Sequence, residues 1–222
     1  MNVRSAPLDE RFDIAAAEIT IAGRRYELLK PRDADELLDE EEFEHDDRIP
    51  YWAELWPSAR VLAERLAERP GNGRRLIELG CGVGLVSLVA QAAGYRVLAT
   101  DYYDDALEFV RANAARNGVE GLATRMVDWR HMPDDLGRFD LVVATDVLYE
   151  KLYAALVPRV IAGLLAPDGM AVVTDPRRGA AAQFPVQCET QDLRIVSKEV
   201  IEKTVDDKTT LVDLFTLQPS LA

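Results

Sequence analysis

The stretch "ELGCGVGLVS" at residues 78–87 decides the fold of this 222-residue chain. Its glycines, at positions 80, 82 and 84, directly follow the apolar run "RRLIEL" (74–79), which predicts a short buried strand. They lead into "GLVSLVAQAAG" (84–94), which predicts a helix that ends at Gly94. A glycine turn between a strand and a helix lets a ligand approach the main chain closely and points helix N–H groups at it. The stretch therefore predicts a binding turn of the nucleotide type.

Strand and helix patterns alternate after this turn. The second strand is predicted at "YRVLATD" (95–101), and "DDALEFVRANAARNG" (104–118) predicts a helix with Asp104 as its N-cap. The third and fourth strands are "LATRMV" and "FDLVVAT", and "MAVVTD" (170–175) is the fifth. Between the last two, "YEKLYAALVPRVIAGLLAPDG" predicts a helix that Pro158 must kink or divide. Strands linked by helices in this way form a parallel sheet with right-handed crossovers.

The two ends of the chain follow a different pattern. Residues 193–203 and 209–217 are alternating β segments with no helix between them, so we expect an antiparallel pair. Residues 17–31 predict a β-hairpin around Ala22-Gly23, and Pro57 predicts a helix start. The fold class is α/β: a Rossmann-like, seven-stranded mixed sheet with its last strand pair antiparallel, helices on both faces and an N-terminal hairpin and helix extension. We expect an N-terminal extension at 1–49 and the main domain at 50–222.

Composition narrows the function classes. A net charge of −13 argues against nucleic acid, because binding to a phosphate backbone depends on Lys and Arg. Two cysteines and two histidines, without metal-ligand spacing, predict no metal site. No stretch has the length of a signal peptide or a membrane span, so we expect a cytoplasmic monomer that does not bind a membrane. The acidic stretch 33–48 is either a solvated or mobile connection or a docking surface.

The spacing of the glycines separates two kinds of nucleotide site. A dinucleotide turn, G-x-G-x-x-G, would need glycine at 85, where this chain has Leu85. The pattern Glu78-x-Gly80-x-Gly82-x-Gly84 instead resembles motif I of the class I S-adenosylmethionine-dependent methyltransferases. The order of strands and helices from 74 to 217 is similar to that family's seven-stranded fold, so the resemblance covers about two-thirds of the chain.

The resemblance implies S-adenosylmethionine as cofactor, and this molecule offers N–H and O–H donors, which carboxylates accept. Asp101, which lies 21 residues beyond Gly80, suits the two ribose hydroxyls. Asp128 suits the adenine amino group, with Trp129 against the ring, and Glu78 suits the amino group of the methionine part. The alternative is that these carboxylates are helix caps or turn residues and that Trp129 belongs to the core. The predicted cofactor-binding residues are Trp56, Glu78, Gly80, Cys81, Gly82, Gly84, Asp101, Tyr102, Asp128, Trp129 and Asp146.

The stretch "DVLY" (146–149) resembles a D-x-x-Y motif that the seven-β-strand protein-lysine methyltransferases carry on the substrate side of the site. The resemblance implies that Asp146 orients the acceptor amine and that Tyr149 offers its hydroxyl and walls the channel; these two are the predicted catalytic residues. The alternatives are that Asp146 caps the following helix, predicted at 149–166, and that Tyr149 packs against the sheet.

Two further segments resemble one branch of this group, which methylates the β subunit of electron transfer flavoprotein. They are "PYWAELWPSARVLAERL", which begins at Pro50, and "DPRRG", which follows the fifth strand. The resemblance implies that Trp56 contacts the cofactor and that Tyr51 and Trp52 wall the acceptor channel. The alternative for Tyr51 and Trp52 is a plain hydrophobic staple. No role is assigned to Arg177 and Arg178.

The resulting hypothesis is an S-adenosylmethionine-dependent N-methyltransferase that acts on a lysine side chain of a protein. Methylation of a small amine or pyridine nitrogen is the alternative. A binding module that has lost catalysis would not need the glycine turn and all three carboxylates, and an NAD-dependent reductase would have to bind NADH despite Leu85.

Overall fold

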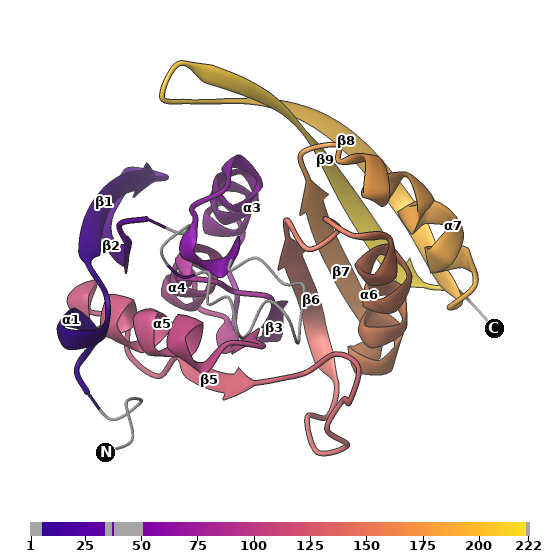
Figure 1. Cartoon of the computed structure of the whole chain (residues 1–222). Coiled ribbons are helices and arrows are strands. Elements are labelled where there is room, and N and C mark those ends of the chain that lie inside the picture. The colour runs from indigo at the N-terminus through magenta and orange to yellow at the C-terminus, as the bar shows by residue number, and fades with distance from the viewer. Residues whose placement is uncertain (1–5, 34–36, 38–50, 221–222) are drawn as a thin grey trace.

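A computed structural model describes residues 6–33, 37 and 51–220, and a seven-stranded sheet forms its centre (Figure 1). The strand order is β5-β4-β3-β6-β7-β9-β8. β3 to β7 run parallel, and β9 is antiparallel to both of its neighbours. The predicted fold class and the antiparallel last pair are confirmed. The strands are β3 Arg75–Leu79, β4 Arg96–Asp101, β5 Ala123–Met126, β6 Phe139–Thr145, β7 Leu165–Asp175, β8 Leu193–Val205 and β9 Lys208–Pro219.

Helices cover both faces of this sheet. One face carries α3 (Pro57–Ala67), α4 (Leu85–Ala92) and α5 (Asp104–Arg116), and the other carries α6 (Lys151–Leu164) and α7 (Phe184–Glu189). The shorter elements are α1 Leu8–Arg11 and the two 3-10 helices η3 Tyr51–Ala53 and η4 Gly179–Gln183.

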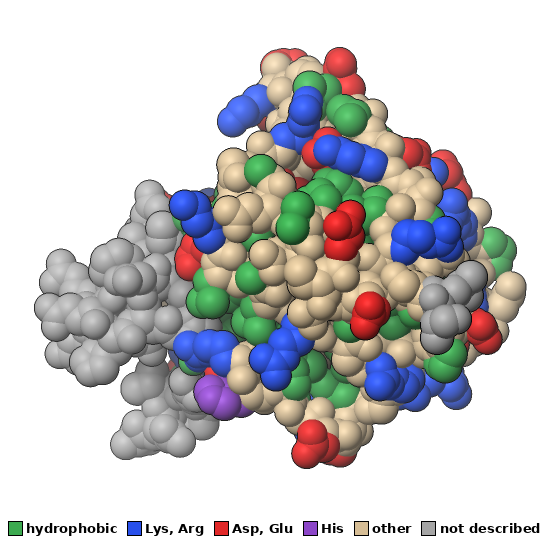
Figure 2. Space-filling view, turned by 90° about the vertical axis from the view of Figure 1, so that its right-hand side faces the viewer, with side chains coloured by type: hydrophobic (Ala, Val, Ile, Leu, Met, Phe, Trp, Pro, Cys, Tyr) green, Lys and Arg blue, Asp and Glu red, His purple; other side chains and the backbone are tan. Residues whose placement is uncertain are grey.

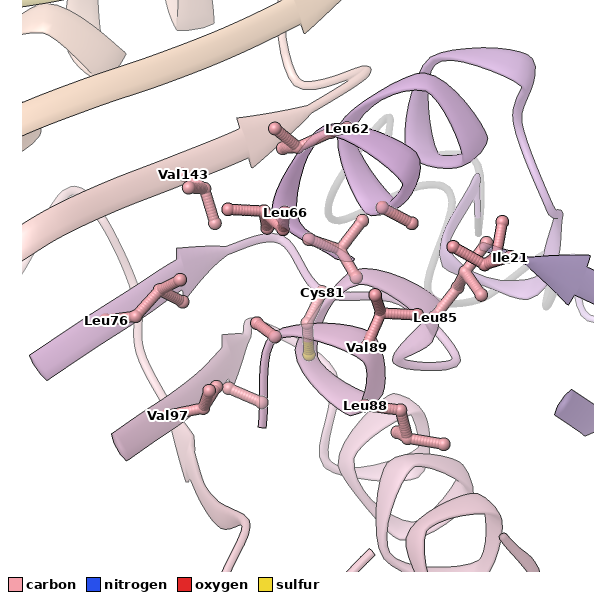
Figure 3. Close-up of a cluster of buried hydrophobic side chains, with 14 of the residues drawn as sticks. Ile21, Leu62, Leu66, Leu76, Cys81, Leu85, Leu88, Val89, Val97 and Val143 are labelled. Atoms are coloured by element: carbon pink, nitrogen blue, oxygen red, sulfur yellow. The ribbon is translucent and has the colours of Figure 1, made fainter. Parts of the chain in front are cut away.

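The side-chain alternation of the strands divides the core into two layers. In β3, Leu76 packs with the α3 and α4 side, whereas Ile77 and Leu79 pack with α6. Figure 3 shows the first layer, in which Leu76 lies near Val97 and Val143 of the neighbouring strands, to the left of the helices. Because both faces of the central strands are buried, the glycine turn is held at the end of a rigid strand.

Three details of the helices differ from the sequence analysis: the cap predicted at Asp104, the cap role that was the alternative for Asp146, and the division of a helix at Pro158. α5 begins at Asp104, with Tyr103 as its N-cap residue, so Asp104 is not the cap. α6 begins at Lys151, with Glu150 in the cap position, so Asp146 does not cap it. Pro158 lies inside α6 without dividing it, because the apolar side chains on both sides of the proline are buried against the sheet. Packing therefore outweighs the one backbone hydrogen bond that proline removes.

The predicted N-terminal hairpin is confirmed as β1 (Ile14–Ile21) and β2 (Arg24–Pro31), which pair antiparallel. Its two-residue turn has positive φ at both Ala22 (48°) and Gly23 (79°), as the twist of a tight hairpin requires. The hairpin shares the first core layer through Ile19, Ile21, Tyr26 and Leu28. The division of the chain at 49/50 stays a prediction, because residues 38–50 lie outside the described residues.

Asn113 of α5 and Asn117, the C-cap residue of that helix, bind the edge of β2 as a neighbouring strand would. The Asn113 amide accepts a hydrogen bond from Leu29 N (2.7 Å) and donates one to Leu29 O (2.9 Å). The Asn117 amide does the same with Glu27, at 2.9 Å and 2.8 Å. Four residues along a helix span about 6 Å, close to the span of two residues along a strand. Asn113 also donates to Val83 O in the glycine turn (2.9 Å), so the hairpin, α5 and the turn are tied together.

The surface away from the glycine turn is mixed. Figure 2 views the side of the molecule on which α7 lies, and hydrophobic side chains there are interspersed with acidic and basic ones.

Among the described helices, none is long and apolar enough to span a membrane. No three His, Cys, Asp or Glu side chains within 6–33, 37 and 51–220 are grouped to hold a metal ion. Both cysteines are buried free thiols. The acidic stretch 33–48 lies almost entirely outside the described residues, and the cytoplasmic location and monomeric state stay predictions.

Replacing Asn113 by Ala should lower the free energy of unfolding by about 2–3 kcal/mol, because it leaves Leu29 N, Leu29 O and Val83 O without their partner. Urea unfolding followed by circular dichroism measures this. Arg111→Ala, a change at an exposed position of the same helix, is the control and should stay within about 0.5 kcal/mol of wild type. Equal effects from the two variants would contradict the docking role of Asn113.

Candidate active site

The carboxyl ends of β3, β4 and β6 and the segment after β5 meet at one pocket of about 960 Å³ that opens to solvent. Open α/β sheets bind ligands at this edge. Every residue predicted for the site lines this pocket, as do Tyr51 and Trp52. The sequence therefore predicted which side chains come together, and the roles assigned to them stay predictions.

The glycine turn adopts a backbone that other residues rarely adopt. Gly80, Gly82 and Gly84 have φ of 68°, 51° and 94°. A Cβ on Gly82 would lie 2.8 Å from Trp52 O, and one on Gly80 would lie 3.0 Å from Val147 Cγ1. Glycine is thus required here both by the left-handed conformation and by the space available. The Cys81 side chain packs in the first core layer, so at this position only the main chain is left to face a ligand.

Asp101 holds the turn from the end of β4. Its Oδ2 accepts a hydrogen bond from Gly82 N (2.9 Å), and its Oδ1 accepts one from Tyr103 N (3.1 Å). Burial raises the pKa of this carboxyl, while these backbone N–H groups oppose the rise. Each carboxylate oxygen can accept a further hydrogen bond, so Asp101 can hold the turn and still receive a diol. Tyr102, next to it, is partly exposed at the pocket.

Glu78 lies at the base of the pocket and is only 1% exposed. Its Oε2 accepts a short hydrogen bond from the Ser87 hydroxyl of α4. Burial raises the pKa of Glu78 to about 8, against the lowering effect of Ser87, and the neighbouring Asp101 raises it further. A buried carboxyl of this kind becomes an anion most readily when a cation lies against it.

Asp128 forms an ion pair with Arg130, a residue that the sequence did not predict to belong to the site. Arg130 donates to both carboxylate oxygens, from Nε to Oδ1 (2.9 Å) and from Nη2 to Oδ2 (2.8 Å). The hydrogen bond from Arg130 holds the pKa of Asp128 well below its usual range. The guanidinium also lies over the Tyr102 ring, with Cζ 5.6 Å from the centroid. Asp128 is therefore an anion, and a ligand amino group would share its oxygens with Arg130.

Asp146 is buried on the other side of the pocket, in a left-handed conformation with φ of 59°. Its Oδ1 accepts a hydrogen bond from Arg178 Nη1 (2.8 Å). Its Oδ2 is buried and makes no hydrogen bond of good geometry with a described group; the Ser58 hydroxyl, which also lacks a partner, is near enough to lower the pKa of the carboxyl. Burial raises the pKa of Asp146 to about 6, although the nearby Arg178 lowers it. A buried oxygen without a partner at a pocket wall is suited to a hydrogen-bond donor on a ligand.

Aromatic side chains line the pocket around Asp146. The Tyr51 and Tyr149 rings lie 5.0 Å apart, and Trp56 Nε1 donates to Tyr51 O (3.1 Å). Tyr153 was not predicted for the site. Its ring centroid lies 4.9 Å from that of Tyr149 and 5.7 Å from that of Trp129. Burial raises the pKa of Tyr149, so its hydroxyl stays protonated. We call these five rings, Tyr51, Trp56, Trp129, Tyr149 and Tyr153, the aromatic wall.

The role that the resemblance implied for Trp52 stays a prediction. Trp52 lines the pocket, but its side chain is buried in a separate cluster, with its ring 5.7 Å from that of Phe109 and 6.3 Å from that of Phe12. The Trp52 carbonyl oxygen faces Gly82.

The fold and this pocket define a class of protein. Magnesium protoporphyrin IX methyltransferase from Synechocystis PCC 6803, solved with bound SAH, superposes with a TM-score of 0.59 at 15% identity over 73% of this chain and 84% of that one. The fold is that of the class I methyltransferases.

The sequence comparisons then give the family. A family model described as "Lysine methyltransferase" matches residues 40–189, more than half of the chain, and the chain belongs to this family. A 148-residue match to the electron transfer flavoprotein beta subunit lysine methyltransferase of Xenopus laevis is 30% identical and covers 65% of this chain and 59% of that protein. The mouse protein-lysine methyltransferase METTL21E is 35% identical over 112 residues, 45% of this chain and 46% of that protein. The chain thus spans about half the length of these curated relatives.

The residues present fit S-adenosylmethionine, the methyl donor of this class. A Cβ at Gly80 or Gly82 would crowd the turn that a ligand must approach, and both positions lack one. Asp101 offers acceptors for a diol, and Asp128 and Glu78 offer acceptors for amino groups. S-adenosylmethionine has no pyrophosphate, so carboxylate acceptors suit its N–H and O–H donors.

The raised pKa of Glu78 makes stability depend on pH. The unfolded carboxyl titrates near 4.5 and the folded one near 8, so the folded chain retains a proton that the unfolded chain has lost. The stability that this retained proton contributes is fully present below pH 4.5. It decreases as pH rises from 4.5 to 8, by up to about 1.4 kcal/mol per pH unit, and is lost above the folded pKa near 8. Urea unfolding between pH 5 and 8.5 should therefore show wild type losing stability relative to Glu78→Gln.

Glu120→Gln makes the same chemical change at an exposed position and is the control. A wild-type and Glu78→Gln difference that is constant with pH would contradict the burial of an ionisable Glu78.

Proposed function

We propose that this protein transfers a methyl group from S-adenosylmethionine to the side-chain amine of a lysine in a protein substrate. The family and the printed names of its relatives support the class of reaction. The observation that carries the proposal is the buried, unpartnered Oδ2 of Asp146 beside the aromatic wall, in the same pocket as the glycine turn and Asp101.

In this proposal the turn side of the pocket holds the donor. Asp101 receives the ribose diol, and Glu78 receives the amino group of the methionine part. Asp128 and Trp129 hold the adenine, and Trp56 and Tyr102 complete the enclosure. The bound donor supplies a sulfonium methyl group, which is electrophilic without help from a metal or a strong base. What the chain contributes is position, and positioning alone can account for a large part of a rate enhancement.

The acceptor half must bring a lysine amine into the pocket in its neutral form. A free lysine has a pKa near 10.4, and moving its amine from water to an apolar surrounding disfavours the ammonium. The aromatic wall supplies that surrounding. Asp146 Oδ2 then accepts a hydrogen bond from the amine and turns its lone pair toward the methyl group, while the Tyr149 hydroxyl is a second polar contact. The proton that the amine releases passes to water.

A protein acceptor is testable with tritiated S-adenosylmethionine and a cell lysate. The wild-type chain should label a protein band, and mass spectrometry of that band should place the methyl group on a lysine. Asp146→Asn should reduce the label by about 100-fold, because the amide oxygen accepts from Arg178 and an NH2 donor then replaces the acceptor that faces the amine. Asp168→Asn, the same change at an exposed position within β7, is the matched control and should label normally.

Label confined to the low-molecular-weight fraction would contradict a protein acceptor and indicate a small amine or pyridine nitrogen. Label on a protein oxygen or on arginine would contradict lysine as the acceptor.

Donor binding is testable independently of any acceptor. Calorimetry with S-adenosylhomocysteine, the demethylated product, should give binding heat with wild type and none with Gly82→Ala, because the added Cβ would meet Trp52 O at 2.8 Å. Gly73→Ala is the control, since Gly73 also has positive φ (74°) but no atom lies within 4 Å of an added Cβ. Both variants carry the same kind of backbone strain, so only steric crowding in the turn separates them. No heat with the wild-type protein would overturn both the cofactor and the enzyme proposal.

A further inference from the structure

Asp146 does not stand alone at the acceptor end of the pocket. Arg178 Nη1 lies 2.8 Å from Asp146 Oδ1 and 3.4 Å from Asp175 Oδ2, so one guanidinium lies between two buried carboxylates. Both carboxylate side chains are at most 5% exposed, and the Arg178 side chain is 23% exposed. An ion pair this well shielded from solvent is screened little by salt and is strongly orienting.

The same guanidinium also reaches the aromatic wall. Arg178 Cζ lies 5.1 Å from the centroid of the Trp56 ring, within the range of a cation–π interaction. Trp56 in turn donates its indole N–H to Tyr51 O. Arg178 thus joins the carboxylate that faces the amine to the rings that surround it.

The local backbone directs Arg178 to this place. Asp175 Oδ1 accepts a hydrogen bond from Arg178 N (2.7 Å), which closes a turn after β7. Arg177, inside the turn, has φ of 63°, and its Nε lies 3.5 Å from Asp213 Oδ1 on β9. The two consecutive arginines therefore point to different partners, and only Arg178 reaches Asp146.

We propose that Arg178 is a positioning residue for methyl transfer, which fixes Asp146 through Oδ1 so that Oδ2 faces the acceptor amine and which holds Trp56 in the wall beside it. This inference rests on the proposed function. It assigns to Arg178 no contact with the donor or the acceptor.

The arrangement also controls the protonation of Asp146. Burial raises the pKa of Asp146 to about 6, the Arg178 guanidinium and the Ser58 hydroxyl of α3 lower it, and the negative charge of Asp175 raises it. Removing the guanidinium leaves burial and Asp175 opposed only by Ser58, so the pKa of Asp146 must rise further. A protonated Asp146 would lose one acceptor site and present an O–H donor to the amine.

The first test reads the carboxyl directly and needs no substrate. In the full chain labelled with ¹³Cγ-aspartate, the Asp146 signal is assigned from its loss in Asp146→Asn and is titrated from pH 4 to 9. Arg178→Gln should move the midpoint upward by about one pH unit or more, and Arg178→Lys should restore part of that shift. Arg177→Gln removes the same charge one residue away, without a contact to Asp146, and should leave the midpoint in place. An unchanged midpoint in Arg178→Gln would overturn the proposal.

The second test measures methylation of the purified substrate identified from the labelled band. Arg178→Gln should lower kcat about 10- to 100-fold with a smaller change in KM, Arg178→Lys should recover part of the loss, and Arg177→Gln should behave as wild type. Heat of S-adenosylhomocysteine binding in each variant confirms that the fold and the donor side are intact. Full activity of a folded Arg178→Gln overturns the positioning role even if Asp146→Asn is inactive. If the wild-type chain labels no protein, the proposed function fails, whereas the titration still decides whether Arg178 sets the state of Asp146.

Discussion

The hydrogen bond from Gly82 N to Asp101 Oδ2 joins the turn after β3 to the end of β4, and the pocket depends on it. A side chain at Gly82 would collide with the Trp52 carbonyl, so the turn can pass beneath the η3 segment only as glycine. Thr100 Oγ1 donates to Glu78 O (2.5 Å) just before the turn, and Cys81 N donates to Thr100 O (2.9 Å) within it. The strand end and the turn are therefore one hydrogen-bonded unit, and any ligand that lies on the turn also lies against Asp101.

The N-terminal hairpin belongs to the same unit through Asn113. The Asn113 side-chain amide hydrogen-bonds to the main-chain N–H and C=O of Leu29 and to Val83 O. The same residue therefore docks β2 and helps to fix the conformation of the glycine turn. The Val83 side chain packs with Trp52, Ala106 and Phe109 in a small apolar cluster. The extension is thus a structural support of the turn, although it lies outside the strand-and-helix repeat of the fold.

The sequence predicts the position of a residue well where a periodic pattern or the end of a strand determines that position. Strand ends of a parallel sheet meet at a single edge, and for this reason Glu78, Asp101, Asp128 and Asp146 could be placed in one pocket from their order along the chain. The contacts of those side chains were not predictable in the same way. Arg178 lies 32 residues from Asp146, and its approach depends on the turn that Asp175 closes and on the φ of Arg177. Arg130 is only two residues from Asp128, yet its rotamer decides whether it faces solvent or the carboxylate. The uninterrupted α6 shows the same limit, because tertiary packing decides what a single Pro158 does.

The pocket and the residues that contact its lining contain more buried carboxyl groups than cations paired with them. Burial raises the pKa of Glu78, Asp101, Asp146 and Asp175. Within the part of the chain that the structure describes, only Asp146 and Asp175 of these four have a cation within ion-pairing distance, the shared Arg178. Ionising Glu78 or Asp101 in the protein alone is therefore costly. In the proposed function, the donor brings an ammonium to Glu78 and carries a sulfonium charge, so it stabilises the ionised carboxylates and they stabilise it. Asp128 differs, since Arg130 already pairs with it, and in the proposed function Asp128 receives the uncharged adenine. Among the described carboxyl groups, Glu78 thus has no cation of its own and lies where the proposed donor is positive, whereas Asp128 is paired with Arg130 and lies where the donor is uncharged.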